Sequence, residues 1–242
     1  MTAQPATTGS VTYSLADGIA HIRLDDGKVN AMSTALIGDI SSALDRAEAD
    51  AAIAVISGRP GIFSAGFHMK EMMSSPENLH TIMNAGARLC LRVLAFPHPV
   101  VTACTGHAYP MGAFIMLSAD YRLGAEGPFR IGLNEVAIGI AVPQFALELA
   151  SHRLAPAHFY RTALTGEMYG PAEALTAGFL DELAPEAALE ETALARASAL
   201  KAIDLASHRT TKARARKPVI AAMTRAIENE LTIEAARKVF GL

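Results

Sequence analysis

The stretch Cys104-Thr-Gly-His-Ala-Tyr-Pro-Met-Gly-Ala-Phe-Ile-Met-Leu-Ser-Ala-Asp-Tyr-Arg122 decides how the rest of the chain is interpreted. It predicts a strand, then a turn of small residues that opens a buried helix. A second, largely apolar stretch at 129–143 carries one acidic side chain, Glu135. Backbone donors at a helix start, with one carboxylate in an apolar wall, suit proton abstraction beside a carbonyl group. A core strand and helix with Glu135 on a solvated edge is the alternative, because isolated motifs mislead.

Composition indicates a large core in one domain, or in one domain with an appendage, and few charged residues for the surface of a monomer. The chain has 242 residues, of which 51% are hydrophobic and 19% charged, and its formal net charge is −3. The low charge content, with a mean hydropathy of +0.25, points to extensive contacts between subunits. No basic run is dense enough for a nucleic-acid partner. No apolar run reaches about 18 residues, so no membrane span is expected.

Cysteine usage and the N-terminal segment indicate a cytoplasmic protein. Residues 1–10 lack the basic start and the apolar run of a signal peptide. Cys90 and Cys104 lie in apolar stretches, so we expect free, buried thiols in a reducing compartment. No Cys and His spacing typical of a metal site occurs, and no metal is expected.

Hydrophobic periodicity predicts an α/β protein with a parallel sheet covered by helices. We expect strands at 11–14, 19–25, 52–57 and 100–103, with helices at 34–49 and 76–94. Two small-residue turns, around 64–66 and 105–112, follow strands, and ligands bind at such places in parallel sheets. The chain after Pro143 is expected to be mainly helical, at 155–164, 171–177, 186–206, 217–231 and 232–240, with a short strand at 179–183.

Five segments in order resemble the crotonase (enoyl-CoA hydratase/isomerase) superfamily. They are Asp26-Gly-Lys-Val-Asn-Ala-Met32, Phe63-Ser-Ala-Gly-Phe-His-Met-Lys70, the 105–122 run, Ile131-Gly-Leu-Asn-Glu-Val-Ala-Ile-Gly139 and the 171–182 segment. The resemblance implies a ClpP/crotonase-like spiral of repeated ββα units with a C-terminal helical region. It also implies that residues 1–184 bind and convert acyl-CoA, and that residues 185–242 form a helical oligomerisation region. A homotrimer or a dimer of trimers is expected.

The resemblance assigns two backbone N–H groups to the thioester oxygen of the substrate, where they stabilise an enolate. By position these belong to Phe67 and Met111, with ordinary core packing as the alternative. The family usually has glycine where Met111 stands, so we expect its side chain to narrow the space. Residues 106–114 are also similar to the nucleophile turn of Clp-type serine proteases. Pro110 occupies the serine position there, which excludes covalent serine catalysis at this turn.

Other site residues follow from the same motifs. No cofactor is expected beyond the coenzyme A that is part of the substrate. The residues expected to bind substrate are Lys28, Asn30, Ala31, Ala65, Gly66, His68, Met69, Lys70, Gly112 and Phe114. Several methionines are candidates for an adaptable acyl tunnel, with core packing as the alternative: Met69, Met72, Met73, Met111 and Met116.

Four further polar groups have less specific expectations. His68 is interpreted as a residue on the CoA side or rim of the site, and His107 as a hydrogen-bonded core histidine. Asp120 and Arg122 are expected to form a structural pair with each other. Lys212 or Lys238 is a candidate for contacting the CoA phosphates, with a solvated surface charge as the more ordinary role.

The acid-base residues favour an isomerase. Hydratases of this family use two glutamates, and the first falls at Phe114, which transfers no proton. The second falls at Glu135, within an Ile-Gly-Leu-Asn-Glu segment that resembles mitochondrial-type Δ3,Δ2-enoyl-CoA isomerases, where one carboxylate shuttles the proton. We expect apolar neighbours to raise the pKa of Glu135: Leu133, Val136 and Ile138. The alternatives are an enoyl-CoA hydratase and a non-catalytic acyl-CoA-binding homologue.

Overall fold

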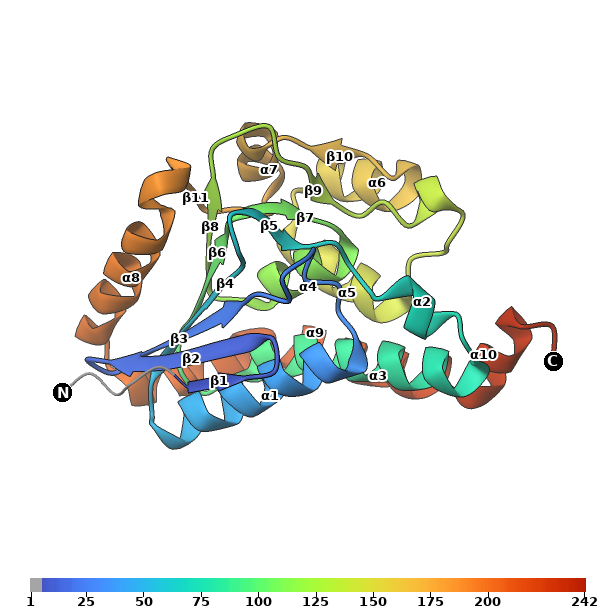
Figure 1. Ribbon diagram of the computed structural model, residues 1–242, viewed down its shortest axis with the longest axis horizontal. Coiled ribbons are helices and arrows are strands. Elements are labelled where there is room, and N and C mark those ends of the chain that lie inside the picture. The colour runs from blue at the N-terminus through green and yellow to red at the C-terminus, as the bar shows by residue number, and fades with distance from the viewer. Residues whose placement is uncertain (1–5) are drawn as a thin grey trace.

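The computed structural model describes residues 6–242, so the expectation about residues 1–10 lies partly outside it. Two sheets form the centre of the molecule (Figure 1). The large sheet consists of β1 (Ala6–Thr8), β2 (Val11–Ala16), β3 (Ile19–Leu24), β4 (Ile53–Ser57), β6 (Val100–Cys104), β8 (Tyr121–Ala125) and β11 (Glu182–Ala184). Its order is β1-β2-β3-β4-β6-β8-β11, and it is parallel from β3 to β11.

A second sheet arises because the same unit is repeated along the chain. It consists of β5 (Gly61–Ser64), β7 (Gly106–Ala108), β9 (Ile131–Gly132) and β10 (Met168–Tyr169). In each repeat one strand joins the large sheet, the next joins the small sheet, and helical structure follows. The ββα repetition is therefore confirmed. Periodicity alone missed the small sheet, since strands of two to four residues are too short to show alternation.

The buried strands divide their side chains between two apolar layers. On β4, Ala54 and Ile56 face the main core, whereas Ile53 and Val55 face a second core on the other side. Helices α1 (Thr34–Ala49), α3 (Pro76–Ala95), α4 (Pro110–Ser118) and α5 (Gln144–Arg153) contribute to the main core. Helix α8 (Leu189–Ala199) covers the second. The predicted strand buried on both faces is confirmed.

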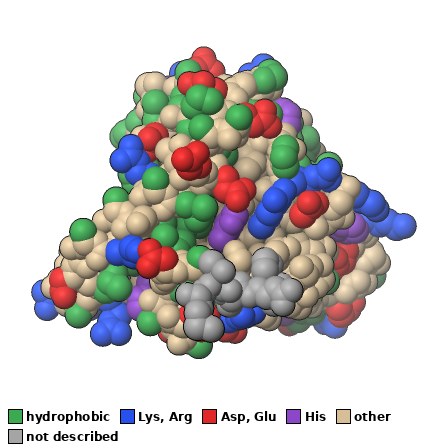
Figure 2. All heavy atoms as spheres, turned by 60° about the vertical axis from the view of Figure 1, so that its left-hand side comes forward, with side chains coloured by type: hydrophobic (Ala, Val, Ile, Leu, Met, Phe, Trp, Pro, Cys, Tyr) green, Lys and Arg blue, Asp and Glu red, His purple; other side chains and the backbone are tan. Residues whose placement is uncertain are grey.

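The remaining helices surround these elements. They are α2 (Met69–Met72), α6 (Pro156–Thr165), α7 (Pro171–Ala177), α9 (Leu205–Glu230) and α10 (Ile233–Val239), with short 3₁₀ helices at Val136–Ile138, Glu186–Ala188 and Leu200–Ala202. Of these, α7 and α9 also bury side chains in the main core, among them Ala174, Ala177, Val219 and Met223. On the face that Figure 2 shows, acidic and basic side chains are interspersed with hydrophobic ones. No helix within residues 6–242 is long and apolar enough to cross a membrane.

Two predicted helix boundaries in the C-terminal region are wrong. The helix expected at 186–206 ends by Ala202, because Ile203 is extended and Asp204 starts a new helix by accepting a hydrogen bond from the Ser207 N–H. The helix expected at 217–231 begins at Leu205 and continues through Pro218. Proline removes one hydrogen bond from a helix, but burial on both sides of it, at Arg216 and Val219, keeps the helix intact.

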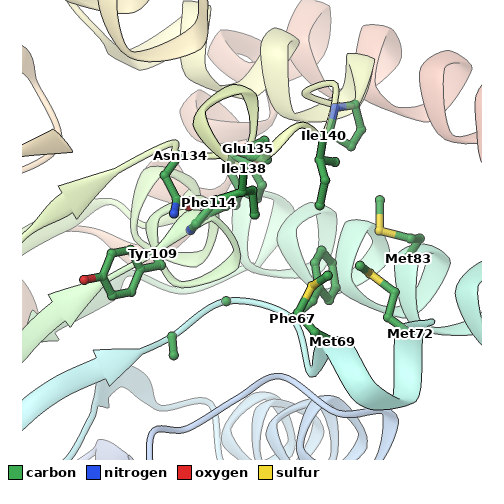
Figure 3. A pocket seen from close by; sticks show the side chains of 14 residues that line it. Phe67, Met69, Met72, Met83, Tyr109, Phe114, Asn134, Glu135, Ile138 and Ile140 are labelled. Atoms are coloured by element: carbon green, nitrogen blue, oxygen red, sulfur yellow. The ribbon is translucent and has the colours of Figure 1, made fainter. Parts of the chain in front are cut away.

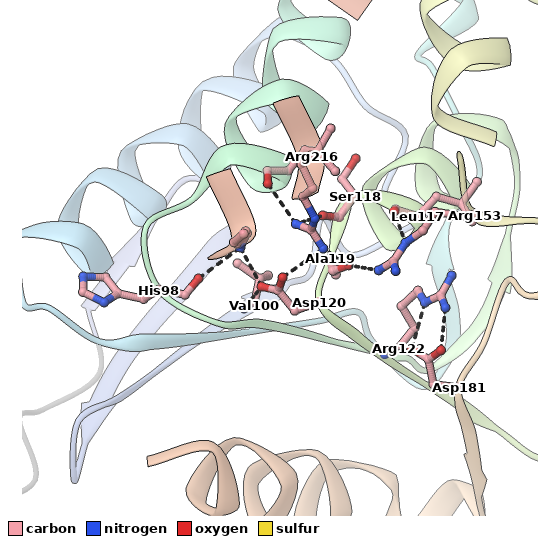
Figure 4. A network of polar contacts seen from close by, with 12 residues as sticks. His98, Val100, Leu117, Ser118, Ala119, Asp120, Arg122, Arg153, Asp181 and Arg216 are labelled. Carbon is pink, nitrogen blue, oxygen red and sulfur yellow. Dashed lines mark hydrogen bonds and ion pairs between the residues drawn. The ribbon is translucent and has the colours of Figure 1, made fainter. Parts of the chain in front are cut away.

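Helix α4 is buried along its length, so its last carbonyl groups need partners other than water. Arg153 of α5 donates hydrogen bonds to the carbonyls of Leu117 and Ala119. Arg216 of α9 donates to Ser118 and Ala119, and also to the end of α3 (Figure 4). Two arginines that are distant in sequence therefore satisfy the C-terminal end of one buried helix.

Asp120 balances the charge of this network. Its carboxylate lies 2.6 Å from Lys212 Nζ. It also lies 2.9 Å from an Arg216 nitrogen (Figure 4). Arg122 pairs instead with Asp181, so the expected Asp120–Arg122 pair is wrong. Lys212 is buried, and burial lowers the pKa of its amine to about 8. It is neither a solvated charge nor free to contact a phosphate group.

Asp120→Ala should destabilise the fold strongly, because it leaves the buried cations Lys212 and Arg216 without their counter-ion. Breaking a buried pair in this way typically costs about 3 kcal/mol or more. Urea denaturation would measure the change in the free energy of unfolding. The matched control is Asp45→Ala, which removes an exposed partner of Arg92 and should cost less than about 1 kcal/mol. Equal effects of the two variants would contradict the stabilising role of Asp120.

Candidate active site

A cavity of about 270 Å³ lies where the two small-residue turns meet the segment that follows β9 (Figure 3). Three parts of the chain that are far apart in sequence form most of its wall. The lining residues are Ala65, Gly66, Phe67, Met69, Met72, Met83, Tyr109, Pro110, Phe114, Asn134, Glu135, Ile138, Ile140 and Pro143. The sequence-predicted turns and Glu135 therefore come together at one place.

The turn after β5 presents a free backbone donor. Met32 bonds to both neighbours of Phe67: its N–H donates to the Gly66 carbonyl at 2.8 Å, and its carbonyl accepts from His68 N–H at 3.1 Å. In this parallel bridge the Phe67 N–H points away from Met32. No acceptor for it is present within residues 6–242. Gly66 makes the turn possible, since its φ of +91° favours glycine.

The start of α4 presents a second free donor. Pro110 is the first residue of this helix, and the N-cap residue Tyr109 makes no side-chain hydrogen bond to it. The first N–H groups of a helix lack partners within the helix, so the Met111 N–H is available. The positive end of the helix dipole also lies here. An anionic oxygen placed between this turn and the Phe67 turn would therefore be stabilised.

Two glycines bring the donor segments together. A Cβ atom on Gly112 would lie 2.9 Å from Ser64 Cβ, so glycine allows α4 to approach the end of β5. A Cβ atom on Gly86 of α3 would lie 2.5 Å from the Phe67 ring and 3.2 Å from Met111 Cε. The Met111 side chain is thus directed towards α3 and is fully buried. The expectation that it narrows the cavity is wrong.

Glu135 stands directly before the 3₁₀ helix Val136–Ile138. Its side chain is 7% exposed, and its Oε2 atom has no hydrogen-bond partner within residues 6–242. Burial raises the pKa of this carboxyl from its ordinary 4.5 to about 7. The predicted rise is confirmed, but only one of the three predicted neighbours, Leu133, is buried, because Val136 and Ile138 are 42% and 56% exposed. The cavity wall itself removes water from Glu135.

Phe114 occupies the position expected for a second acid. Its side chain is buried in the cavity wall and packs edge-on against Phe145, with ring centroids 5.8 Å apart. Glu135 is accordingly the one carboxyl that lines the cavity among the residues the structure describes. Tyr109 and Asn134 are the other polar side chains there (Figure 3). The sequence reasoning missed both, although Asn134 adjoins the predicted base.

The remaining predicted binding residues divide into three groups. Ala65, Gly66, Met69 and Phe114 line the cavity, while His68 borders it as the N-cap of α2, accepting a hydrogen bond from Glu71 N–H. Lys28 and Lys70 are exposed, and Ala31 is partly buried. The Asn30 side chain is fully buried and donates to the carbonyls of Leu24 and Phe63. It holds the early loop in place and does not reach the cavity.

The structure separates the methionines that line the cavity from those that lie in the core, and it gives the hydrogen-bond partner of His107. Met69 and Met72 line the cavity with Met83, which was not predicted, whereas Met111 and Met116 lie in the core. His107 is half-buried and accepts a hydrogen bond from Arg130 N–H at 3.0 Å, which confirms its hydrogen-bonded role. Cys90 and Cys104 are free and buried, as expected.

This arrangement combines a site for an oxyanion with a single proton-transfer group. Two free N–H groups can polarise a carbonyl oxygen in a largely apolar cavity, where hydrogen bonds to developing charge are strong. A carboxyl with a pKa near 7 can both accept and return a proton at neutral pH. Residues 6–242 hold no group of three His, Cys, Asp or Glu side chains able to bind a metal.

The chain is similar in sequence and in structure to proteins described as enoyl-CoA hydratases or isomerases. The family model described as enoyl-CoA hydratase/isomerase matches residues 14–237. A crystal structure of an enoyl-CoA hydratase/isomerase family protein from Pseudomonas syringae is 44% identical, with a TM-score of 0.90 over 92% of this chain and 96% of that one. An enoyl-CoA hydratase from Mycobacterium ulcerans is 36% identical, with a TM-score of 0.90 over 94% of this chain and 99% of that one.

Human mitochondrial enoyl-CoA delta isomerase 1 is 31% identical over 205 residues, which are 83% of this chain and 68% of that protein. The chain spans 60% of the length of the mouse and rat proteins of the same name. The structural matches confirm the spiral of ββα units with a C-terminal helical region. The names of these relatives include both a hydratase and an isomerase.

Glu135→Gln should stabilise the protein at high pH more than at low pH. The folded-state pKa of about 7 exceeds the ordinary 4.5, so stability is lost as the pH rises and the buried carboxyl ionises. The gain in the free energy of unfolding should be larger at pH 8 than at pH 5 by about 2 kcal/mol. Denaturant titrations at both pH values measure it, with the exposed Glu126→Gln as control. A gain that is equal at both pH values would contradict the raised pKa.

Proposed function

The chain belongs to the enoyl-CoA hydratase/isomerase family, and from that premise we propose that it is a Δ3,Δ2-enoyl-CoA isomerase. The family acts on acyl-CoA thioesters, so an acyl-CoA is the substrate. The observation that carries the proposal is the single buried carboxyl of Glu135 facing a cavity with two free backbone donors.

In the proposed reaction Glu135 removes a proton from C2 of a 3-enoyl-CoA. The electron pair of the C2–H bond moves towards the thioester oxygen, which accepts hydrogen bonds from the N–H groups of Phe67 and Met111. The resulting dienolate takes the same proton back at C4, and the double bond then lies between C2 and C3. One group with a pKa near the working pH suffices for both transfers.

The hydratase alternative needs a group that activates or protonates water opposite Glu135. Phe114 fills that part of the wall with a buried aromatic ring, which supports isomerisation over hydration. A protein that only binds acyl-CoA has no need of a buried carboxyl without a partner, since such a group destabilises the fold when it ionises. Glu135 therefore disfavours the non-catalytic alternative.

The expected assembly is part of the same proposal. We propose a homotrimer or a dimer of trimers, in which the helices of residues 185–242 mediate contacts between subunits. Exposed apolar side chains within this region, at Ile203 and Val239, support contacts with another chain, and so do Tyr160 and Leu164 on α6. Light scattering at micromolar concentration should return three or six times the mass of the chain. A monomer would contradict the assembly while leaving the proposed reaction intact.

Glu135→Gln should abolish isomerisation while leaving acyl-CoA affinity nearly unchanged. Glutamine keeps the size of the side chain but accepts no proton, whereas the backbone donors of Phe67 and Met111 remain. Removal of a positioned acid-base group typically lowers the rate by about 10²–10⁴-fold, and the described cavity wall offers no second carboxyl. Turnover of a 3-enoyl-CoA and the affinity for a saturated acyl-CoA should be measured on the same preparation.

The matched controls separate chemistry from folding. Glu126→Gln alters an exposed glutamate away from the cavity and should leave turnover unchanged. Phe114→Glu restores a second carboxyl and should increase hydration of a 2-enoyl-CoA relative to isomerisation. Near-normal turnover of Glu135→Gln would remove this residue from the mechanism. Hydration as fast as isomerisation in the unmodified protein would favour the hydratase.

A further inference from the structure

The turn at 65–68 contains several backbone N–H groups, and only that of Phe67 lacks an acceptor within residues 6–242. The others donate hydrogen bonds of 3.0 to 3.2 Å: Ala65 to the Val29 carbonyl, Gly66 to the Ser64 hydroxyl oxygen and His68 to the Met32 carbonyl. The partners of the neighbouring groups therefore determine which N–H the turn offers to a ligand. One of these partners, the Ser64 hydroxyl, is a side chain that a substitution can remove.

Gly66 is held on both sides of its Cα atom. Its φ of +91° and its missing side chain leave the backbone free to rotate unless other contacts restrain it. Its N–H donates to Ser64 Oγ at 3.2 Å, and its carbonyl accepts from Met32 N–H at 2.8 Å. In a planar trans peptide the Gly66 carbonyl and the Phe67 N–H point in opposite directions. Restraining both polar groups of Gly66 therefore fixes the direction of the Phe67 N–H.

The Ser64 hydroxyl is itself oriented by the early loop. It donates its one hydrogen to the Asn30 carbonyl at 2.8 Å, so a lone pair of the oxygen is left for the Gly66 N–H. Asn30 has a φ of +49°, which asparagine tolerates better than most residues. Its side chain is fixed by hydrogen bonds to the carbonyls of Leu24 and Phe63. Ser64 is fully buried, so water does not compete for its hydroxyl.

The main chain of Ser64 is bonded to the segment that carries the second donor. Its carbonyl accepts from the N–H of Tyr109, the N-cap residue of α4, at 3.0 Å. Met111 follows two residues later. Ser64 is thus bonded to the turn of Phe67 through its side chain and to the start of α4 through its backbone. It does not line the cavity, so it acts on a ligand only through these neighbours.

We propose that Ser64 is a positioning residue, whose hydroxyl aims the Phe67 N–H so that this group and the Met111 N–H bind the same thioester oxygen. The inference rests on the proposed function, in which negative charge develops on that oxygen. Hydrogen bonds to such charge depend on donors that are already in place before the reaction. Loss of the Ser64 hydroxyl should therefore reduce polarisation of the thioester more than it reduces acyl-CoA binding.

The test is Ser64→Ala, which removes the hydroxyl and keeps the carbonyl that bonds to Tyr109. Isotope-edited infrared spectroscopy of a bound saturated acyl-CoA measures the thioester C=O frequency, which falls as hydrogen bonds to the oxygen strengthen. We expect Ser64→Ala to lose part of this fall and to lower kcat for a 3-enoyl-CoA by about tenfold to a hundredfold. Acyl-CoA affinity should change little, and the pH profile of kcat, set by Glu135, should keep its midpoint.

The matched control is Ser57→Ala. Ser57 is also a buried serine at the end of a strand, with its hydroxyl 2.7 Å from His21 Nε2, and it does not line the cavity. Its loss removes a buried hydrogen bond and should change neither the C=O frequency nor kcat. Ser64→Cys keeps a weaker hydrogen-bonding group at the same position. Its frequency and kcat should lie between those of Ser64→Ala and the unmodified protein, which preserves the test if Ser64→Ala does not fold.

An unchanged C=O frequency and kcat in Ser64→Ala would overturn the positioning role. Equal losses in Ser57→Ala would also overturn it, because they would show a general effect of destabilisation. If the unmodified protein lowers the C=O frequency and Ser64→Ala reverses this, but no 3-enoyl-CoA is isomerised, the positioning role stands and the proposed reaction is refuted.

Discussion

The burial of α4 is the constraint on which the rest of the structure depends. A helix without contact to water must find partners for the backbone groups at both of its ends. At the C-terminal end, Arg153 and Arg216 donate to the last carbonyls, and Asp120 offsets part of the charge they bring into the core. At the N-terminal end, the Met111 N–H donates to no acceptor in the part of the chain that the structure describes. The helix is thus satisfied at one end and open to a ligand at the other.

The burial of Glu135 also lowers the stability of the fold while preparing the side chain for proton transfer. A buried carboxyl without a hydrogen-bond partner weakens the fold when it ionises, yet that burial is what brings its pKa to about 7. The apolar ring of Phe114 contributes to the dry wall and leaves Glu135 without a second acid. The donors and the carboxyl lie on segments after β5, β7 and β9, which the repeated ββα unit places side by side.

Local sequence patterns predicted much of this arrangement. They did not predict contacts between segments that are far apart in the sequence. The buried strands β4 and β6, the amphipathic α1 and the Glu135 segment carry their signal locally, so each was found. The resemblance then placed the two donor turns. The partners of Asp120 lie about 90 residues away on α9, and the space that turns Met111 away from the cavity is a missing side chain at Gly86. Neither contact gives a periodic pattern in the sequence. The helix predicted to begin at 217 begins at Leu205 instead and continues through Pro218.

The position of Arg216 also has a consequence for the order in which the protein matures on the ribosome. The strands and turns that form the cavity are all complete by Pro143, but the carbonyls that end α4 acquire the Arg216 donor only when α9 has been made. Until then the nascent chain leaves these buried carbonyls incompletely satisfied, and partly folded chains of this kind are prone to aggregate. Translation of the last quarter of the chain therefore completes a helix that was synthesised about a hundred residues earlier.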